Sequence, residues 1–321
     1  NHWLLAWLSL ELNTLSILPM MMKQPHPRMV EATTKYFIVQ TAAAASILFA
    51  SAINAWQMGQ WTIMYTTNTL TPTLITIAIM LKMGMAPTHT WYPEILQGTP
   101  MGIAMLISTW QKLAPMALLF MMHNNLNPHL LLIIALISAI VGGWAGINQT
   151  QTRKIMAFSS IAHMGWITAA LTINQDLSTL TMIIYLITTT ATFATLTTTK
   201  TKTIHDTNST WASTPTLTTI MAITLVSLGG LPPLTGFMPK LLIIKDLSSS
   251  GLLILSTTLL LASLPSLFFY TRIAYLTTLT TPTTTTNAKM KWRLTSPTPI
   301  ITLPLIISCL MLPMTASLYT T

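Results

Sequence analysis

Charge is scarce in this sequence, and acidic charge is scarcer still. Of the 321 residues only 7% are charged, with 15 Lys and Arg residues against 6 Asp and Glu residues. A typical soluble domain carries about 25% charged residues, and a charged, mixed surface keeps such a domain in water. A soluble enzyme of this size is therefore not expected. A disordered chain is not expected either, because disorder needs low hydrophobicity together with high charge.

Cysteine is nearly absent as well. The single Cys309 excludes a disulfide framework within the chain and any cluster held by several of its cysteines. Of the seven histidines only His163 lies in the middle of an apolar stretch, which argues against a haem held by facing histidines inside the membrane. The formal net charge of +9 does not point to nucleic acid, because the basic residues are thinly spread and lie in short loops.

Apolar residues take the place of the missing charge. They make up 51% of the chain, and the mean hydropathy is +0.61. A helix that crosses the hydrocarbon core of a bilayer needs about 20 mostly apolar residues. Threonine is common in such stretches here and is compatible with them, because its hydroxyl can bond a carbonyl one turn earlier. The sequence predicts an all-α polytopic membrane protein with ten transmembrane helices, at 3–22, 36–56, 68–87, 99–122, 129–147, 155–172, 178–198, 214–243, 252–271 and 298–317.

The basic residues between these stretches collect on one side of the predicted membrane. Loops that follow odd-numbered spans carry 11 Lys and Arg residues, whereas the loops that follow even-numbered spans carry only Lys245. Positive residues gather on the side from which a membrane protein is inserted. The count of ten spans therefore predicts that both visible ends lie opposite the basic loops.

Two of the stretches contain helix-breaking sequences at membrane depth. The stretch 68–87 ends in KMGMAP, and the stretch 214–243 contains LGGLPPLTGFMPK. Proline removes a backbone donor and clashes with the preceding turn, so these segments predict two broken helices, around Lys82–Pro87 and Gly229–Lys240. They lie five spans apart, and an odd offset gives opposite orientations, which is typical of the inverted repeats of transporters.

The inverted repeat divides the chain into two halves of a single domain. We expect a single membrane domain over 1–321, with a first repeat at 1–122 and a second repeat at 129–271. A long basic loop at 273–297 and a terminal helix at 298–317 follow.

Four ionisable side chains lie well inside the apolar stretches: Glu11, Lys82, Lys112 and Lys240. Each costs about 2.5–3.5 kcal/mol at the centre of a membrane helix, so such residues normally face a protein interior or a wet cavity. Lys82 and Lys240 lie nearer the ends of their spans, where a lysine can instead extend its ammonium to the membrane surface. His163 is a fifth candidate, which can pass protons through its two ring nitrogens or serve only in a hydrogen-bonded helix contact.

These residue types suit a proton relay. Burial favours the neutral forms of Lys and Glu, whereas an adjacent opposite charge favours the charged forms. A buried Glu near a Lys is therefore a two-state switch, because the lysine can release its proton when the two separate. A membrane scaffold with no transport role is the alternative, and neutral replacement of Lys112 distinguishes the two.

Four segments together resemble the antiporter-like membrane subunits of respiratory complex I, a family related to multi-subunit cation/proton antiporters. The segments are KMGMAPTHTWYPE (82–94), WQKLAP (110–115), NQTQTRKIMAFSSIAHMGW (148–166) and LGGLPPLTGFMPK (228–240). The resemblance runs along almost the whole chain. It implies that one helix of the first repeat precedes Asn1.

The resemblance also implies a role for each candidate. Glu11 matches the acidic member of a buried Glu–Lys pair, and Lys82, on the first broken helix, matches its partner. Lys112 matches a central lysine, and Lys240, on the second broken helix, matches the terminal lysine near the exit side. His163 falls in the region that bridges the two half-channels. The implied activity is that of a subunit of a proton-translocating NADH:ubiquinone reductase, with quinone reduction elsewhere in the complex driving the protons.

Cofactors, partners and location follow from the same resemblance. It implies no cofactor in this chain, with flavin and iron–sulfur clusters in other subunits. The implied partners are neighbouring antiporter-like subunits of the membrane arm and phospholipids. The implied location is the mitochondrial inner membrane, with the basic loops in the matrix and both visible termini on the intermembrane-space side.

The alternative is a cation/proton antiporter acting outside a respiratory complex. Sodium sites use oxygen ligands, and Glu11 is the only carboxylate within a predicted span, which favours protons.

Overall fold

A computed structural model describes residues 1–23, 26–66, 69–211, 214–232, 234–279 and 302–310. Over these ranges the chain is helical without a β-strand, and its extended segments form isolated bridges, between His2 and Thr62 and between Gln151 and Thr203. The helices are α1 (Trp3–Met21), α2 (Pro27–Met58), α3 (Leu70–Met83), α4 (Trp91–Gly98), α5 (Met101–Ser108), α6 (Trp110–Met121), η1 (His123–Asn125), α7 (Pro128–Ile147), α8 (Thr152–Ile173), α9 (Gln175–Thr199), α10 (Ile204–Thr210), α11 (Pro215–Gly229), α12 (Phe237–Ser249), α13 (Leu253–Thr278) and α15 (Thr302–Leu310).

Seven helical segments in the described ranges are long and apolar enough to cross a membrane. They are α1, α2, the segment Met101–Met121 that comprises α5 and α6, α7, α8, α9 and α13. Two shorter apolar helices, α3 and α11, lie within the predicted stretches 68–87 and 214–243. The all-helical, multi-span character predicted from the sequence is confirmed. Residues 280–297 of the predicted basic loop, and 298–301 and 311–317 of the predicted last span, lie outside the described residues.

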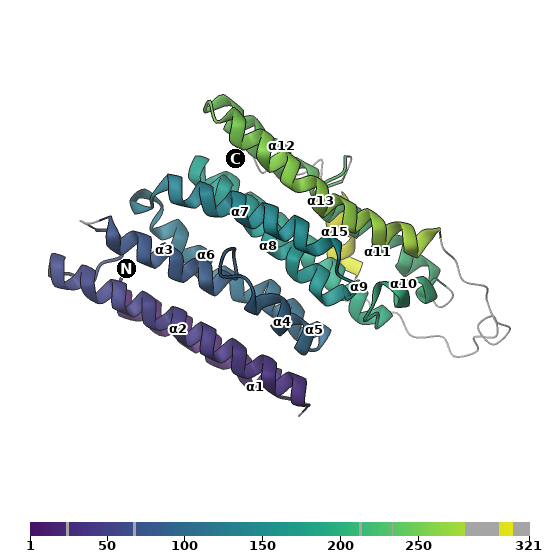
Figure 1. Ribbon diagram of the computed structural model, residues 1–321, viewed down its shortest axis with the longest axis horizontal. Coiled ribbons are helices and arrows are strands. Elements are labelled where there is room, and N and C mark those ends of the chain that lie inside the picture. The colour runs from purple at the N-terminus through teal and green to yellow at the C-terminus, as the bar shows by residue number, and fades with distance from the viewer. Residues whose placement is uncertain (24–25, 67–68, 212–213, 233, 280–301, 311–321) are drawn as a thin grey trace. The chain divides into compact units, whose positions relative to one another are not determined.

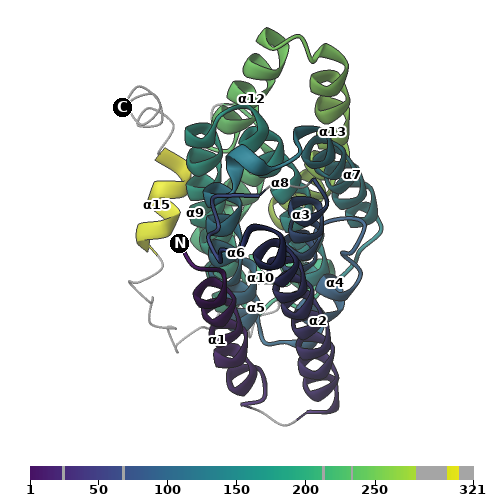
Figure 2. The same cartoon turned by 90° about the vertical axis from the view of Figure 1, so that its left-hand side faces the viewer.

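The chain divides into two units. The first comprises residues 1–141 and 160–175, and the second comprises residues 142–159 and 176–321. Within the first unit α2 packs against α1, α3 and α4, and α6 packs against α1 and α3; α1 and α2 lie side by side in both views (Figures 1 and 2). Within the second unit α13 packs against α10, α11 and α12, and α11 contacts α15.

The long helix α2 has clear start and stop signals. His26 caps its first turn by accepting a hydrogen bond from the Arg28 N–H through Nδ1, and Pro27 occupies the first helical position. Gly59, with a φ of 68°, ends the helix in the left-handed conformation that favours glycine. Its 32 residues span roughly 48 Å at 1.5 Å per residue, well beyond a hydrocarbon core of about 30 Å. One end of α2 therefore extends past the membrane core.

Threonine hydroxyls are satisfied inside the helices, as the sequence predicted. In α9 the hydroxyl of Thr188 donates to the Ile184 carbonyl at 2.8 Å, and that of Thr189 donates to the Tyr185 carbonyl at 2.7 Å. Both side chains are buried. A hydroxyl bonded to its own helix carries no unpaired donor into an apolar environment. A threonine-rich segment can therefore remain a membrane helix.

Candidate functional site

Residues 84–90 separate α3 from α4, and we call this segment the first interruption. Gly84, with a φ of 70°, ends α3. Its N–H donates to the Leu81 carbonyl at 3.2 Å, and the Met85 N–H donates to the Met80 carbonyl at 3.0 Å. These two bonds form a Schellman motif, which satisfies carbonyls at a helix C-terminus. The motif places Lys82 in the last turn of α3.

The second interruption, between α11 and α12, has the same geometry. Gly230, with a φ of 80°, donates to the Ser227 carbonyl at 3.0 Å, and Leu231 donates to the Val226 carbonyl at 3.5 Å. Seven residues separate the two half-helices in each case, 84–90 and 230–236. Lys240 lies in the first turn of α12, and its Nζ donates to the carbonyl of Gly229 at 2.8 Å. The Lys240 ammonium therefore lies at the C-terminal end of α11, where the helix dipole favours positive charge.

Lys82 and Lys112 line the same small cavity within the first unit. Both side chains are buried, with exposed fractions of 6% and 2%. The cavity measures about 10 Å³, close to the minimum that holds one water molecule. The Lys112 Nζ lies 4.8 Å from the centroid of the Tyr92 ring, a cation–π geometry. The other polar side chains of the lining are those of Asn13, Thr14, Tyr36, Gln40 and Gln111.

Glu11 lies beside this cavity on α1, half-buried. Its carboxylate is the acidic group that interacts electrostatically with Lys82. No ion pair of 4.0 Å or less joins the two within the described part of the chain. The Oε2 atom of Glu11 and the Nζ atom of Lys82 are both buried, and neither has a hydrogen-bond partner there. Two opposite charges thus lie near one another without closing into a pair.

The remaining two candidates lie elsewhere in the fold. His163 is on α8, in the part of that helix that belongs to the first unit, and is half-buried. It is not among the residues that line the cavity of Lys82 and Lys112. Lys240 belongs to the second unit. The structure therefore brings together Glu11, Lys82 and Lys112, each from a different helix of one unit.

Several uncharged polar residues line this cavity but are not among the candidates from the sequence. Tyr92 comes from the short helix α4, and Gln40 donates to the carbonyl of Lys82 at 3.3 Å. Asn13 and Gln111 hydrogen-bond to each other across α1 and α6. Asn13, Gln40 and Gln111 could have been found from the sequence, because they lie inside apolar stretches. Such side chains are costly there unless they face a protein interior.

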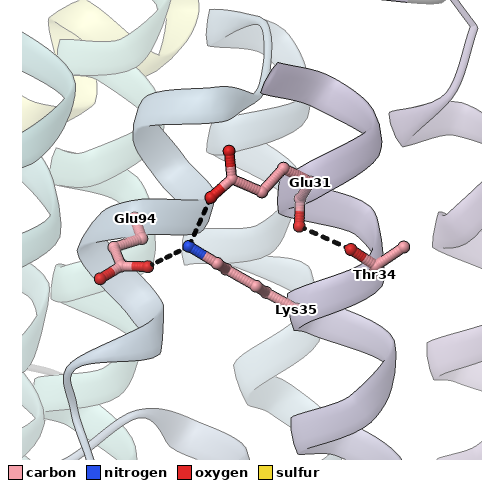
Figure 3. Close-up of polar contacts among 4 residues, drawn as sticks. All are labelled: Glu31, Thr34, Lys35 and Glu94. Carbon is pink, nitrogen blue, oxygen red and sulfur yellow. Dashed lines mark hydrogen bonds and ion pairs between the residues drawn. The ribbon is translucent and has the colours of Figure 1, made fainter. Parts of the chain in front are cut away.

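A second group of charges lies at the start of α2, outside the predicted span 36–56. Lys35 Nζ pairs with Glu31 at 2.6 Å and with Glu94, on α4, at 2.7 Å (Figure 3). The hydrogen bond from Lys35 lowers the pKa of the Glu31 carboxyl, and the hydrogen bonds to Glu31 and Glu94 raise the pKa of Lys35. All three side chains are well exposed, so each pair contributes little to stability by itself. The contact nevertheless ties α4, which carries Tyr92, to α2.

We expect Lys35→Met to loosen α4 without unfolding the unit. The exchange removes the ion pair to Glu94, but the close packing of Gly98 against Ala32 remains. Backbone amides of 91–98 should then exchange hydrogen faster in the intact protein, measured by mass spectrometry. Glu31→Gln is the matched control, because Glu31 contacts Lys35 from the same helix and should leave α4 protected. Equal exchange in wild type and Lys35→Met would show that the ion pair does not hold α4.

Within the described residues, no group of three or more His, Cys, Asp and Glu side chains is arranged to hold a metal ion.

An all-helical chain with several apolar membrane-length helices and two buried lysines on one polar cavity is a polytopic membrane protein. Its residues 1–266 match the family described as NADH:quinone oxidoreductase/Mrp antiporter, TM, and residues 267–319 match the family described as NADH dehydrogenase subunit 2 C-terminus. NADH-ubiquinone oxidoreductase chain 2 of Xenopus laevis is 49% identical over 315 residues, which cover 98% of this chain and 91% of the relative. The chain therefore belongs to the family of NADH-ubiquinone oxidoreductase chain 2 proteins.

Solved structures agree with this fold. A chain of respiratory complex I from Thermus thermophilus with bound Aureothin has a TM-score of 0.85 at 23% identity, covering 99% of this chain and 74% of that one. A chain of the Mrp complex from Dietzia sp. DQ12-45-1b has a TM-score of 0.83 at 15% identity, covering 99% and 72%. At these identities the likeness establishes the antiporter-like fold.

Proposed function

We propose that the chain is a core membrane-arm subunit of the proton-translocating NADH–ubiquinone oxidoreductase of the mitochondrial inner membrane. In this role it moves protons through Glu11, Lys82, Lys112, His163 and Lys240, with water between them. One observation carries the proposal: Lys82 and Lys112, both buried, line one polar cavity beside the interruption of an apolar helix. Burying two cations together is costly, and a structural scaffold gains nothing from it.

The chemistry follows from the charges around the cavity. When Glu11 approaches Lys82, the carboxylate holds the lysine in its charged form. When the two separate, burial favours release of the Lys82 proton, and Lys112 on the same cavity can accept it through a bridging water. From Lys112 the proton passes by water and His163 to Lys240. Moving one charge against the membrane potential costs about 2.3 kcal/mol per 100 mV. The free energy needed to separate an ion pair in a low-dielectric interior is large enough to control that step.

We further propose the full ten-span arrangement, with the basic loops in the matrix. Contacts in the loops and at the ends of spans support it, because each of them joins two segments on the same predicted side. They are Lys35 with Glu94, His2 with Thr62, Thr152 with Lys202, and Arg272 with the carbonyl of Ile147. One span more or fewer between such partners would place them on opposite sides of the bilayer.

The inverted repeat belongs to the same proposal. Its support is the pair of interruptions, each with a Schellman motif at a glycine and seven residues between half-helices. Repeated discontinuous helices mark ion paths in transporters. In this arrangement the flavin and iron–sulfur clusters belong to other subunits, and neighbouring antiporter-like subunits and phospholipids surround the chain.

The competing function is exchange of a metal cation for protons by a protein acting outside a respiratory complex. The likeness to a chain of the Mrp complex concerns the fold, which both functions share. The cavity offers a single nearby carboxylate, Glu11, and two lysines, which suits a proton better than a sodium ion because the lysines repel a second cation.

A direct test is proton translocation by the purified complex in sealed vesicles. On addition of NADH and a quinone we expect proton movement of the same extent with sodium salts and with choline salts, followed by a pH-sensitive dye. Sodium flux measured with a radioactive tracer should stay at background. Proton movement that requires sodium, or a stoichiometric sodium counterflow, would contradict the proposed function and support cation/proton exchange instead.

A further inference from the structure

Asn13 of α1 and Gln111 of α6 bond to each other through both of their side-chain amides. Asn13 Nδ2 donates to Gln111 Oε1 at 3.0 Å, and Gln111 Nε2 donates back to Asn13 Oδ1 at 3.3 Å. Gln111 Nε2 also donates to the backbone carbonyl of Asn13 at 3.1 Å. The two residues are 98 positions apart in the sequence. We call this pair the amide clasp.

The clasp lies on the cavity of the two lysines. Asn13 and Gln111 both contribute to its lining, together with Lys82 and Lys112. Gln111 directly precedes Lys112 on α6. Pro115, one turn later, has no N–H to offer the carbonyl of Gln111, so the backbone of α6 is less constrained here than in an ordinary helix.

The clasp also connects one side of α1 to α6, while Trp7 Nε1 donates to the Ala44 carbonyl of α2 at 3.1 Å on another side. Asn13 follows Glu11 by two residues, so the two side chains leave α1 in nearly opposite directions, about 200° apart around the axis. Asn13 is bonded to α6, whereas Glu11 interacts electrostatically with Tyr36 of α2 and with Lys82 of α3. A rotation of α1 that moves Glu11 must therefore stretch the bonds of Asn13.

Amides are unusual anchors in apolar helices. A side-chain amide inside a membrane is unfavourable without partners, and here each amide supplies the other with both a donor and an acceptor. Replacing one of them by an apolar residue leaves the other unsatisfied, which is more costly than replacing both. The clasp is therefore a specific connection between two helices.

We propose that Asn13 and Gln111 are positioning residues that fix α1 against α6 and thereby set the separation between Glu11 and Lys82. This inference rests on the proposed proton relay and extends it. The clasp holds the carboxylate near the lysine but outside ion-pair distance, so that a small displacement of α1 closes or opens the pair. Without the clasp, α1 keeps its packing on α2 but loses these bonds to α6, so the separation between Glu11 and Lys82 is no longer coupled to α6.

The test uses the intact complex with three sets of variants. Gln111→Met removes the amide at similar side-chain volume, and Gln111→Asn keeps an amide that is one methylene too short to reach. The exchange Asn13→Gln with Gln111→Asn restores a pair of the same total length. Gln149→Met is the control, because Gln149 bonds a carbonyl of its own segment, that of Ala145, at 3.2 Å.

Both single variants at Gln111 should assemble and should pump about threefold to tenfold fewer protons per NADH, the range that a polar contact between membrane helices is worth. The double exchange should restore pumping. Labelling of Glu11 by a hydrophobic carbodiimide should accelerate by a similar factor in the single variants, since the carboxylate is no longer held in place. The Gln149→Met complex should match wild type in both measurements.

Three results overturn the clasp: normal pumping in both assembled single variants, unchanged labelling of Glu11, or failure of the double exchange to restore pumping. If Gln111→Met does not assemble, Gln111→Asn and the double exchange still decide between these outcomes. Glu11→Gln separates the two proposals. Normal pumping by Glu11→Gln would contradict the proposed relay. Loss of pumping in Glu11→Gln together with normal pumping in the Gln111 variants would contradict only the proposed role of the clasp.

Discussion

A complex that carries Lys112→Met should assemble normally and translocate no protons through this subunit. Methionine keeps the length and most of the volume of the lysine side chain, so the buried position stays filled. A buried charge is costly to keep in apolar surroundings, so its removal at similar volume is expected to leave the fold intact. The substitution removes the ammonium over Tyr92, which is the proposed proton acceptor on the cavity shared with Lys82. The expected loss therefore concerns transport.

The measurement is the number of protons moved per NADH oxidised in sealed vesicles, with native gel electrophoresis to quantify assembly. Coupled NADH oxidation should fall together with pumping, because the relay and quinone reduction are linked. Lys245→Met is a suitable control, since Lys245 is exposed on α12 and touches neither the cavity nor the interruption. Normal pumping by an assembled Lys112→Met complex would make the two buried lysines structural and end the relay assignment.

Much of the helical layout could be predicted from the sequence, because a bilayer imposes simple requirements on length and hydropathy. Glycine also marked the ends of α3 and α11, although the sequence could not show that Gly84 and Gly230 end these helices in one motif. That detail depends on backbone hydrogen bonds. The predicted stretch 99–122 corresponds to the membrane-length segment Met101–Met121, within which α5 and α6 meet at Thr109. The hydroxyl of Thr109 donates to the Met105 carbonyl at 2.7 Å.

The charged members of the site were predictable, and their neighbours were not. A lysine in an apolar stretch stands out because its burial is costly. A neutral residue such as Tyr92, outside the predicted spans, does not stand out, and its position on the cavity follows from packing between helices that are distant in sequence. No local sequence pattern indicates the ion pair of Glu94, because its partner Lys35 lies 59 residues earlier. Pairings of this kind require the tertiary structure.

The interruption that carries Lys240 should tolerate no side chain at Gly236. A Cβ atom at this position would collide with the backbone carbonyl of Ser227 on α11, a contact that no flexible side chain can relieve. In Gly236→Ala the start of α12 must move away from α11, and the bond from Lys240 Nζ to the Gly229 carbonyl is lost. Overpacking of this kind costs about 1–3 kcal/mol, and here it also displaces Lys240, which we propose as a member of the relay.

Gly102→Ala provides the matched comparison. Gly102 lies in α5, and no neighbouring atom lies within 4 Å of the position that an alanine Cβ would take, so alanine there adds helix propensity without a clash. We expect Gly102→Ala to assemble and pump as wild type does. Gly236→Ala should lower the amount of assembled complex, and the complex that does assemble should pump poorly. If the two alanine variants behave alike, the close approach of α12 to Ser227 does not govern the position of Lys240, and the second interruption would have to act through some other contact.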